Sequence, residues 1–93
     1  MQKEQRRLQD LISVGPAILG GFDKLGIRSV TQLARQDPRK MYEKLCRAKG
    51  EQVDICCLDV FTAAVAQARN PLLPAQKCQL WYWSRKRKAR DAK

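Results

Sequence analysis

The residues best suited to binding a ligand lie around a Gly-Pro pair near the N-terminus. Gly15 and Pro16 interrupt the apolar helical pattern, and Pro suits the first position of a new helix. A helix start presents unpaired backbone N–H groups and the positive end of the helix dipole, so it can bind a phosphate group. The candidate N–H donors and flanking charges are Val14, Gly15, Ala17, Ile18, Lys24 and Arg28.

Other residue types offer little catalytic or metal-binding chemistry. The chain has no histidine, the commonest general base and metal ligand. Its four cysteines, Cys46, Cys56, Cys57 and Cys78, contain no Cys-x-x-Cys pair. Cys56 and Cys57 lie in an apolar helical pattern, so buried, inert thiols are favoured over a redox switch, and Cys78 beside Lys77 is the better candidate for an exposed thiol. We therefore expect a protein that binds no metal, uses no cofactor and has no enzymatic activity.

The net charge points to a polyanionic partner. The chain has 19 Lys and Arg against 9 Asp and Glu, a formal charge of +10. Residues 85–93 hold six basic residues and one acid, so half of the charge lies in this tail. The basic residues that could assist binding are Lys40, Lys44, Arg47, Arg85, Lys86, Arg87 and Lys88. The first three share one helix face, which is also the usual pattern of a solvated surface.

Length and composition favour one small globular domain. The chain has 93 residues, of which 44% are hydrophobic and 30% charged. Its apolar runs are too short for a membrane span or a signal peptide, so we expect a cytoplasmic protein. The expected organisation is a helical domain over residues 1–84 and a basic, disordered tail over residues 85–93.

Helical periodicity and capping signals predict an all-α fold. The expected elements are an amphipathic helix ending near Ile12, a second from Pro16 to Gly26, a third after a Ser29–Gln32 capping box, a fourth from Asp37-Pro38 to Gly50, and a long, most buried fifth from about Gln52 to Ala68. An aromatic segment containing Trp81, Tyr82 and Trp83 follows. It could clamp the core or form a stacking platform for bases. Gly20-Gly21 within the second helix indicates a close helix crossing or, alternatively, close approach of a ligand.

Residues 11–27, LISVGPAILGGFDKLGI, resemble the helix-hairpin-helix motif, in which a hydrophobic-Gly-hydrophobic-Gly turn joins two helices. Gly15 matches the second glycine of that turn, whereas Ser13 occupies the first glycine position and Leu19 a position usually held by a small residue. The segments RSVTQLA (28–34), MYEKLC (41–46), DVFTAAV (59–65) and WYW (81–83) extend the likeness. Over about residues 7–84 the chain resembles the small bacterial pathogenicity-locus family, some members of which are labelled mitomycin-resistance proteins.

The resemblance implies a compact bundle of about five short helices containing a helix-hairpin-helix (SAM-like) motif. The Gly15 turn, with its unpaired N–H groups, favours a non-catalytic module that contacts the phosphate backbone of duplex DNA without sequence specificity. The alternative is a purely structural turn in a protein-interaction module, which the departure at Ser13 favours. An enzyme related to hairpin-containing glycosylases, with Lys24 and Asp23 or Asp37 as acid and base, is least favoured because so short a chain leaves little room for a base-extruding pocket. We therefore expect DNA, and not a membrane, as the partner.

Overall fold

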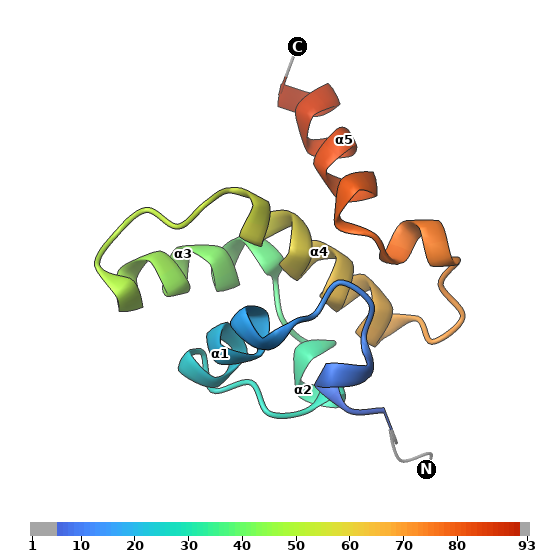
Figure 1. Ribbon diagram of the computed structural model, residues 1–93, viewed down its shortest axis with the longest axis horizontal. Helices are drawn as coiled ribbons and strands as arrows, with labels where there is room; N and C mark the ends of the chain where they lie inside the picture. Colours follow the sequence, from blue (N-terminus) through green and yellow to red (C-terminus); the bar gives the residue numbers. More distant parts are fainter. Residues whose placement is uncertain (1–5, 92–93) are drawn as a thin grey trace.

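The computed structural model describes residues 6–91, and every regular element in this range is a helix (Figure 1). The elements are the 3-10 helix η1 (Leu8–Asp10), α1 (Pro16–Lys24), α2 (Val30–Leu33), α3 (Pro38–Lys49), α4 (Cys56–Arg69), the 3-10 helix η2 (Ala75–Cys78) and α5 (Leu80–Asp91). The all-α fold predicted from the sequence is confirmed. None of these helices is long and apolar enough to cross a membrane.

Helix α4 is the central element. Nine of its 14 residues are buried, so it needs packing partners around most of its circumference. Helices α2, α3 and α5 all pack against it, and α3 and α5 lie on different sides of it (Figure 1). The sequence prediction that this helix is the most buried one is therefore confirmed.

The centre of the core lies where α1 packs against α3 and its Phe22 side chain reaches α4. Phe22 of α1 and Phe61 of α4 have no exposed surface, and their ring centroids are 5.8 Å apart. A Cβ atom on Gly21 would lie 3.7 Å from Leu45 and 3.8 Å from Phe61, which is ordinary van der Waals contact. Gly21 is thus at the helix crossing that the sequence favoured, whereas Gly20 faces open space.

Helix ends follow the sequence signals closely. Pro16 and Pro38 each occupy the first turn of a helix, and the Asp37 carboxylate accepts a hydrogen bond from the Arg39 N–H (2.9 Å). Gly26 and Gly50 end α1 and α3 with φ of 75° and 67°. This left-handed conformation strains residues that carry a Cβ, which is why glycine stands at both positions.

The predicted capping box before α2 forms only in part. The Ser29 hydroxyl accepts a hydrogen bond from the Gln32 N–H (3.0 Å), as expected. The Gln32 side chain, however, accepts from the N–H of Arg28 rather than of Ser29, and it donates to the Gly26 carbonyl (2.7 Å). Gln32 therefore ties the whole connection between α1 and α2 together.

Helix α4 begins later than the sequence suggested, at Cys56 instead of about Gln52. The Tyr42 hydroxyl donates to the Val53 carbonyl, and the Asp54 carboxylate accepts from the Cys56 N–H (3.0 Å). These contacts hold the preceding segment against α3 in a non-helical conformation. The side chains that make them come from two different parts of the chain.

The prediction of an amphipathic helix that ends near Ile12 is wrong, because the only regular element in the described part of this segment is the 3-10 turn η1. Gln67, buried on α4, accepts from the Ile12 N–H and donates to the Ile12 carbonyl, both at 2.8 Å. These groups are therefore not available for a continuing α-helix, while Leu11 packs into the core. The expected start of this helix, before residue 6, lies outside the described residues.

The basic tail also differs from the expectation. Residues 85–91 are not a disordered end but continue α5; residues 92 and 93 lie outside the described range. The Arg87 guanidinium donates to both carboxylate oxygens of Asp59, at 2.9 and 3.1 Å. Asp59 is only 2% exposed, so this pair compensates a buried charge and docks α5 on α4.

Replacing Arg87 with Gln should destabilise the protein by about 3 kcal/mol, because it leaves the Asp59 carboxylate buried without its cation. Urea unfolding followed by circular dichroism measures the change. Lys88→Gln, which removes an equal charge from the exposed side of the same helix, should alter the free energy of unfolding by less than about 0.5 kcal/mol. Equal effects of the two substitutions would contradict a special role for the buried pair.

Candidate nucleic-acid interface

The turn before α1 keeps the conformation that a glycine would favour at Ser13. This residue has φ of 73°, the only positive value at a non-glycine position in the described part of the chain. A side chain in this region costs roughly 1 kcal/mol or more. The serine that stands at the first glycine position of the hairpin pattern therefore changes the residue type but retains the left-handed backbone.

Two distant side-chain contacts hold this turn. The Ser13 hydroxyl donates to the Cys78 carbonyl at 3.2 Å, which ties the turn to η2. Gln67 of α4 bonds both backbone groups of Ile12. Sequence reasoning missed Gln67, because a lone glutamine in an apolar helix gives no indication of a partner 55 residues away.

Gly15 is not required by the fold. Its φ is −109°, an extended value open to any residue, and a Cβ atom built on it would meet nothing within 4 Å. It is the N-cap of α1, but it supplies no side chain to cap the helix. Its one structural consequence is an uncovered backbone at the start of α1.

Three of the four predicted N–H donors are available. The N–H groups of Gly15, Ala17 and Ile18 have no hydrogen-bond acceptor among the described residues. The N–H of Val14 is already bonded to the Leu11 carbonyl at 3.3 Å, so Val14 is a weaker donor than the sequence suggested. Free N–H groups and the helix dipole together make this turn attractive to an anion.

The predicted flanking charges do not surround the turn. Lys24 ends α1 and Arg28 follows it, whereas Gly15 precedes the first residue of the helix. At 1.5 Å per residue the two ends of α1 are about 12 Å apart. Lys24 and Arg28 therefore cannot contact the same phosphate as the turn.

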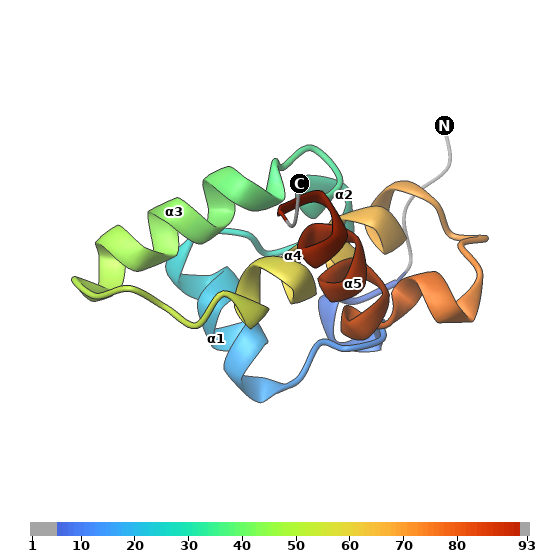
Figure 2. The ribbon, with the colours of Figure 1, turned by 90° about the horizontal axis from the view of Figure 1, so that it is seen from above.

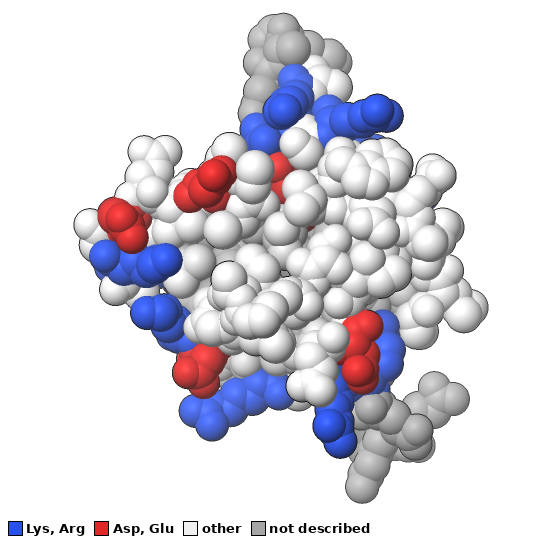
Figure 3. Space-filling model, in the orientation of Figure 1, with Lys and Arg blue, Asp and Glu red and all other residues white. Residues whose placement is uncertain are grey.

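The basic face of α3 also points elsewhere. Lys40, Lys44 and Arg47 are exposed, but α3 runs along one edge of the molecule and the turn before α1 lies at the opposite edge (Figure 2). The face that carries this turn is uncharged at its centre, with acidic and basic side chains gathered around its margin (Figure 3). Sequence reasoning could not reveal this separation, because the spacing of residues along a helix does not show which side of the molecule the helix covers.

The aromatic segment divides between two environments. Trp83 is half-buried, and its indole N–H donates to the Lys77 carbonyl at 2.7 Å. Trp81 is 46% exposed and lies under the Arg85 guanidinium, 5.3 Å from the ring centroid. Tyr82 lies edge-on to both indoles. One tryptophan is thus held against the body of the protein and the other faces solvent.

The exposure of Cys56 and Cys78 is the opposite of what the sequence predicted. Cys56 is exposed, whereas Cys78 is buried beside the carbonyl groups of Leu73 and Pro74. Hydrogen bonding and the charge of Asp54 raise the pKa of the Cys56 thiol, and burial raises the pKa of Cys78. Both thiols are therefore poorer nucleophiles than a free cysteine at neutral pH.

Comparison with known proteins places the chain in a family. Residues 1–89 match the sequence profile described as "Pathogenicity locus" (Cdd1). The chain belongs to the pathogenicity-locus family. It is 36% identical over 81 residues to the "Mitomycin resistance protein McrB" of Streptomyces lavendulae, an alignment that covers 87% of this chain and 73% of that protein. No solved structure matches this pathogenicity-locus protein.

The two glycines around α1 should differ in their effect on stability. Gly26→Ala should lower the free energy of unfolding by about 1 kcal/mol, because alanine is strained at φ of 75°. Gly15→Ala should change it by less than about 0.5 kcal/mol, because its φ is ordinary and its surroundings are open. Denaturant unfolding of both variants measures the difference. A large loss in Gly15→Ala would mean that the fold itself requires this glycine.

Cys56 should react slowly with iodoacetamide at pH 8 despite its exposure, because its raised pKa leaves less thiolate than in a free cysteine. Asp54→Asn removes the carboxylate responsible and should accelerate alkylation several-fold at this pH. Mass spectrometry of the Cys56 peptide over time gives the rate. Glu51→Gln is the control, since it removes a nearby exposed charge that does not contribute to this shift. Equal rates in the wild type and in Asp54→Asn would contradict the assignment.

Proposed function

We propose that this pathogenicity-locus protein is a non-catalytic DNA-binding module that contacts the phosphate backbone of duplex DNA through the turn before α1. The observation that carries the proposal is that the N–H groups of Gly15, Ala17 and Ile18 find no acceptor within residues 6–91, at a helix start without a capping side chain. A phosphate oxygen would satisfy these groups and would benefit from the helix dipole.

Gly15 gives the proposal independent support. Neither its backbone conformation nor its packing calls for glycine. A side chain at this position would, however, project into the space from which a phosphate reaches the N–H groups. Close approach of an external group is thus a physical reason for glycine that the folded chain alone does not supply.

The basic residues would act beyond the turn. Lys24 and Arg28, at the far end of α1, would contact a different phosphate of the same DNA backbone. The formal charge of +10 would add long-range attraction that depends on salt. Contacts of this kind read no base edges, so binding would be independent of DNA sequence. A bacterial DNA-binding protein of this type would lie in the cytoplasm with the nucleoid.

One observation favours a second function, a protein-interaction module. The face around the turn is uncharged at its centre (Figure 3), and Ile12 and Trp81 are large apolar residues that remain 41% and 46% exposed. Exposed apolar surface is typical of protein-binding sites. A protein partner recovered in stoichiometric amount from nuclease-treated extract, together with no binding to DNA, would favour this alternative.

Fluorescence anisotropy with a labelled 20-base-pair duplex tests the first function. Affinity should fall with salt by about 0.9 log units per log unit for each neutralised phosphate, and two unrelated sequences should bind equally. Gly15→Ala should weaken binding about tenfold, the equivalent of one charge-assisted hydrogen bond. Gly20→Ala is the matched control: its Cβ also meets nothing within 4 Å, but it lies more than one turn along α1.

Three results would contradict the proposal. The first is the absence of binding at low salt. The second is equal weakening by Gly15→Ala and Gly20→Ala, which would move the contact from the turn to the body of α1. The third is binding that Gly15→Ala leaves unchanged but that Arg85→Gln/Lys88→Gln abolishes, which would transfer the function to α5.

A further inference from the structure

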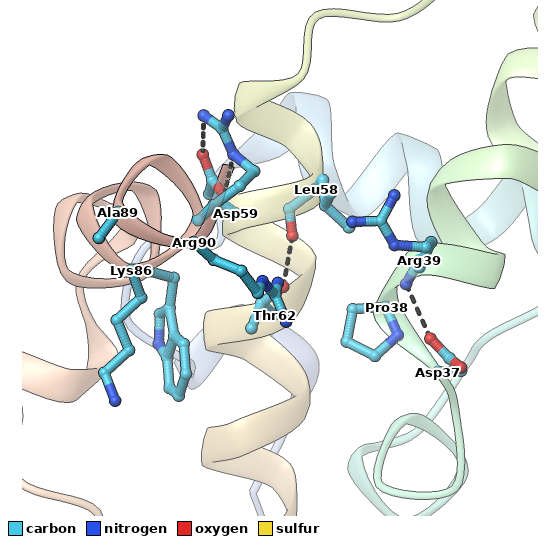
Figure 4. Close-up of a pocket in the computed structure, with 11 residues that line it drawn as sticks. Asp37, Pro38, Arg39, Leu58, Asp59, Thr62, Lys86, Ala89 and Arg90 are labelled. Carbon is cyan, nitrogen blue, oxygen red and sulfur yellow. Dashed lines mark hydrogen bonds and ion pairs between the residues drawn. The ribbon is translucent and has the colours of Figure 1, made fainter. Parts of the chain in front are cut away.

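A groove of about 550 Å³ lies between the start of α3 and α5, with α4 as its floor (Figure 4). This volume is within the range of sites that bind small molecules. Pro38 and Arg39 form one wall, Lys86 and Arg90 belong to the opposite wall, and Leu58 and Thr62 lie between them. The groove is separate from the turn before α1, since no residue of that turn lines it.

The walls carry positive charge with little compensation. Arg39 and Arg90 extend from opposite sides toward α4 (Figure 4), and no carboxylate in the described residues forms an ion pair with either guanidinium. Asp59, the acid on the floor, is already paired with Arg87. Asp37 is at the margin, where its carboxylate caps α3. The groove therefore offers guanidinium groups whose planar forks suit a phosphate.

An aromatic ring completes the groove. Trp83 lines it, and the hydrogen bond from its indole N–H to the Lys77 carbonyl fixes the ring. Tyr82 packs edge-on against this indole, with ring centroids 5.0 Å apart. A ring held in this way can stack on a planar ligand without first losing conformational freedom. Leu58 and Ala89 add apolar surface elsewhere in the groove.

We propose that this groove binds a nucleotide unit of single-stranded nucleic acid, with its base against Trp83 and its phosphate between Arg39 and Arg90. An inorganic anion would make no use of the apolar floor, and an uncharged aromatic compound would make no use of the cations. A base joined to a phosphate uses both, and base stacking on an aromatic side chain is worth about 1–3 kcal/mol. A base-paired duplex does not present an unstacked base, so this site is distinct from the duplex contact proposed for the turn.

The spacing of residues along α5 shows that one face of this helix lines the groove. Trp83, Lys86 and Arg90 recur at i, i+3 and i+7, which places them on one face of the helix. Arg85 and Lys88 carry the same charges on the same helix but do not line the groove. The chain thus supplies its own control for non-specific electrostatic attraction.

The fluorescence of Trp83 tests this proposal. A Trp81→Phe background leaves Trp83 as the only tryptophan, and Trp81 does not line the groove. Titration with an eight-nucleotide thymidine oligonucleotide should quench this fluorescence to saturation. Arg39→Gln/Arg90→Gln should weaken binding at least tenfold, whereas Arg85→Gln/Lys88→Gln, with the same loss of charge, should weaken it less than threefold. Arg39→Gln and Arg90→Gln, one on each wall, should each weaken binding when made alone, and circular dichroism verifies that every variant is folded.

Thymidine monophosphate in a second titration distinguishes the source of the ligand. Quenching by the monophosphate with an affinity equal to that of the oligonucleotide would support the groove as a site for free nucleotides of the same chemistry. If neither the oligonucleotide nor the monophosphate quenches the fluorescence, the proposal is overturned. Equal weakening by the two double variants would also overturn it, because it would show charge attraction alone. Gly15→Ala should leave the oligonucleotide titration unchanged, so the failure of one proposed site does not imply the failure of the other.

Discussion

The structure depends on covering α4 on every side. This helix carries nine of the buried residues in the described part of the chain, more than any other element, including the fully buried Phe61 and the charged Asp59. Apolar surface on one side is covered by α1, α2 and α3, whereas the Asp59 carboxylate requires a cation. Arg87 supplies it, and α5 is thereby brought against α4. A segment with the composition of a solvated tail thus becomes part of the fold.

The docking of α5 has consequences for the basic residues. In a disordered tail, these basic residues would attract any polyanion but would not be held in a fixed arrangement. On a helix held against α4 they separate into one set that lines a groove, with Lys86 and Arg90, and another that faces solvent, with Arg85 and Lys88. The same docking places Trp83 in the groove. Charge that the sequence could not assign to a surface therefore acquires a location and an aromatic partner.

The turn before α1 illustrates how contacts distant in sequence maintain a local conformation. Gln67 and the Cys78 carbonyl hold Ile12 and Ser13, and Ser13 adopts a left-handed conformation that glycine would adopt without strain. The pathogenicity-locus protein thus keeps an open helix start without the first glycine of the hairpin pattern. The pattern of apolar and glycine residues predicted this turn, but not the side chains that support it.

Local signals in the sequence determined the helices that begin and end at Pro and Gly. Pro16, Gly26, Pro38 and Gly50 act through their own backbone preferences, so α1 and α3 could be placed to within a residue or two. Helical periodicity likewise identified α4 as the most buried element. The tertiary structure decided the form of residues 6–12 and 85–91, the exposure of Cys56 and Cys78, and the separation of the basic residues from the turn. These properties depend on partners such as Gln67 for Ile12 and Asp59 for Arg87, which are far apart in sequence and meet only when the helices pack.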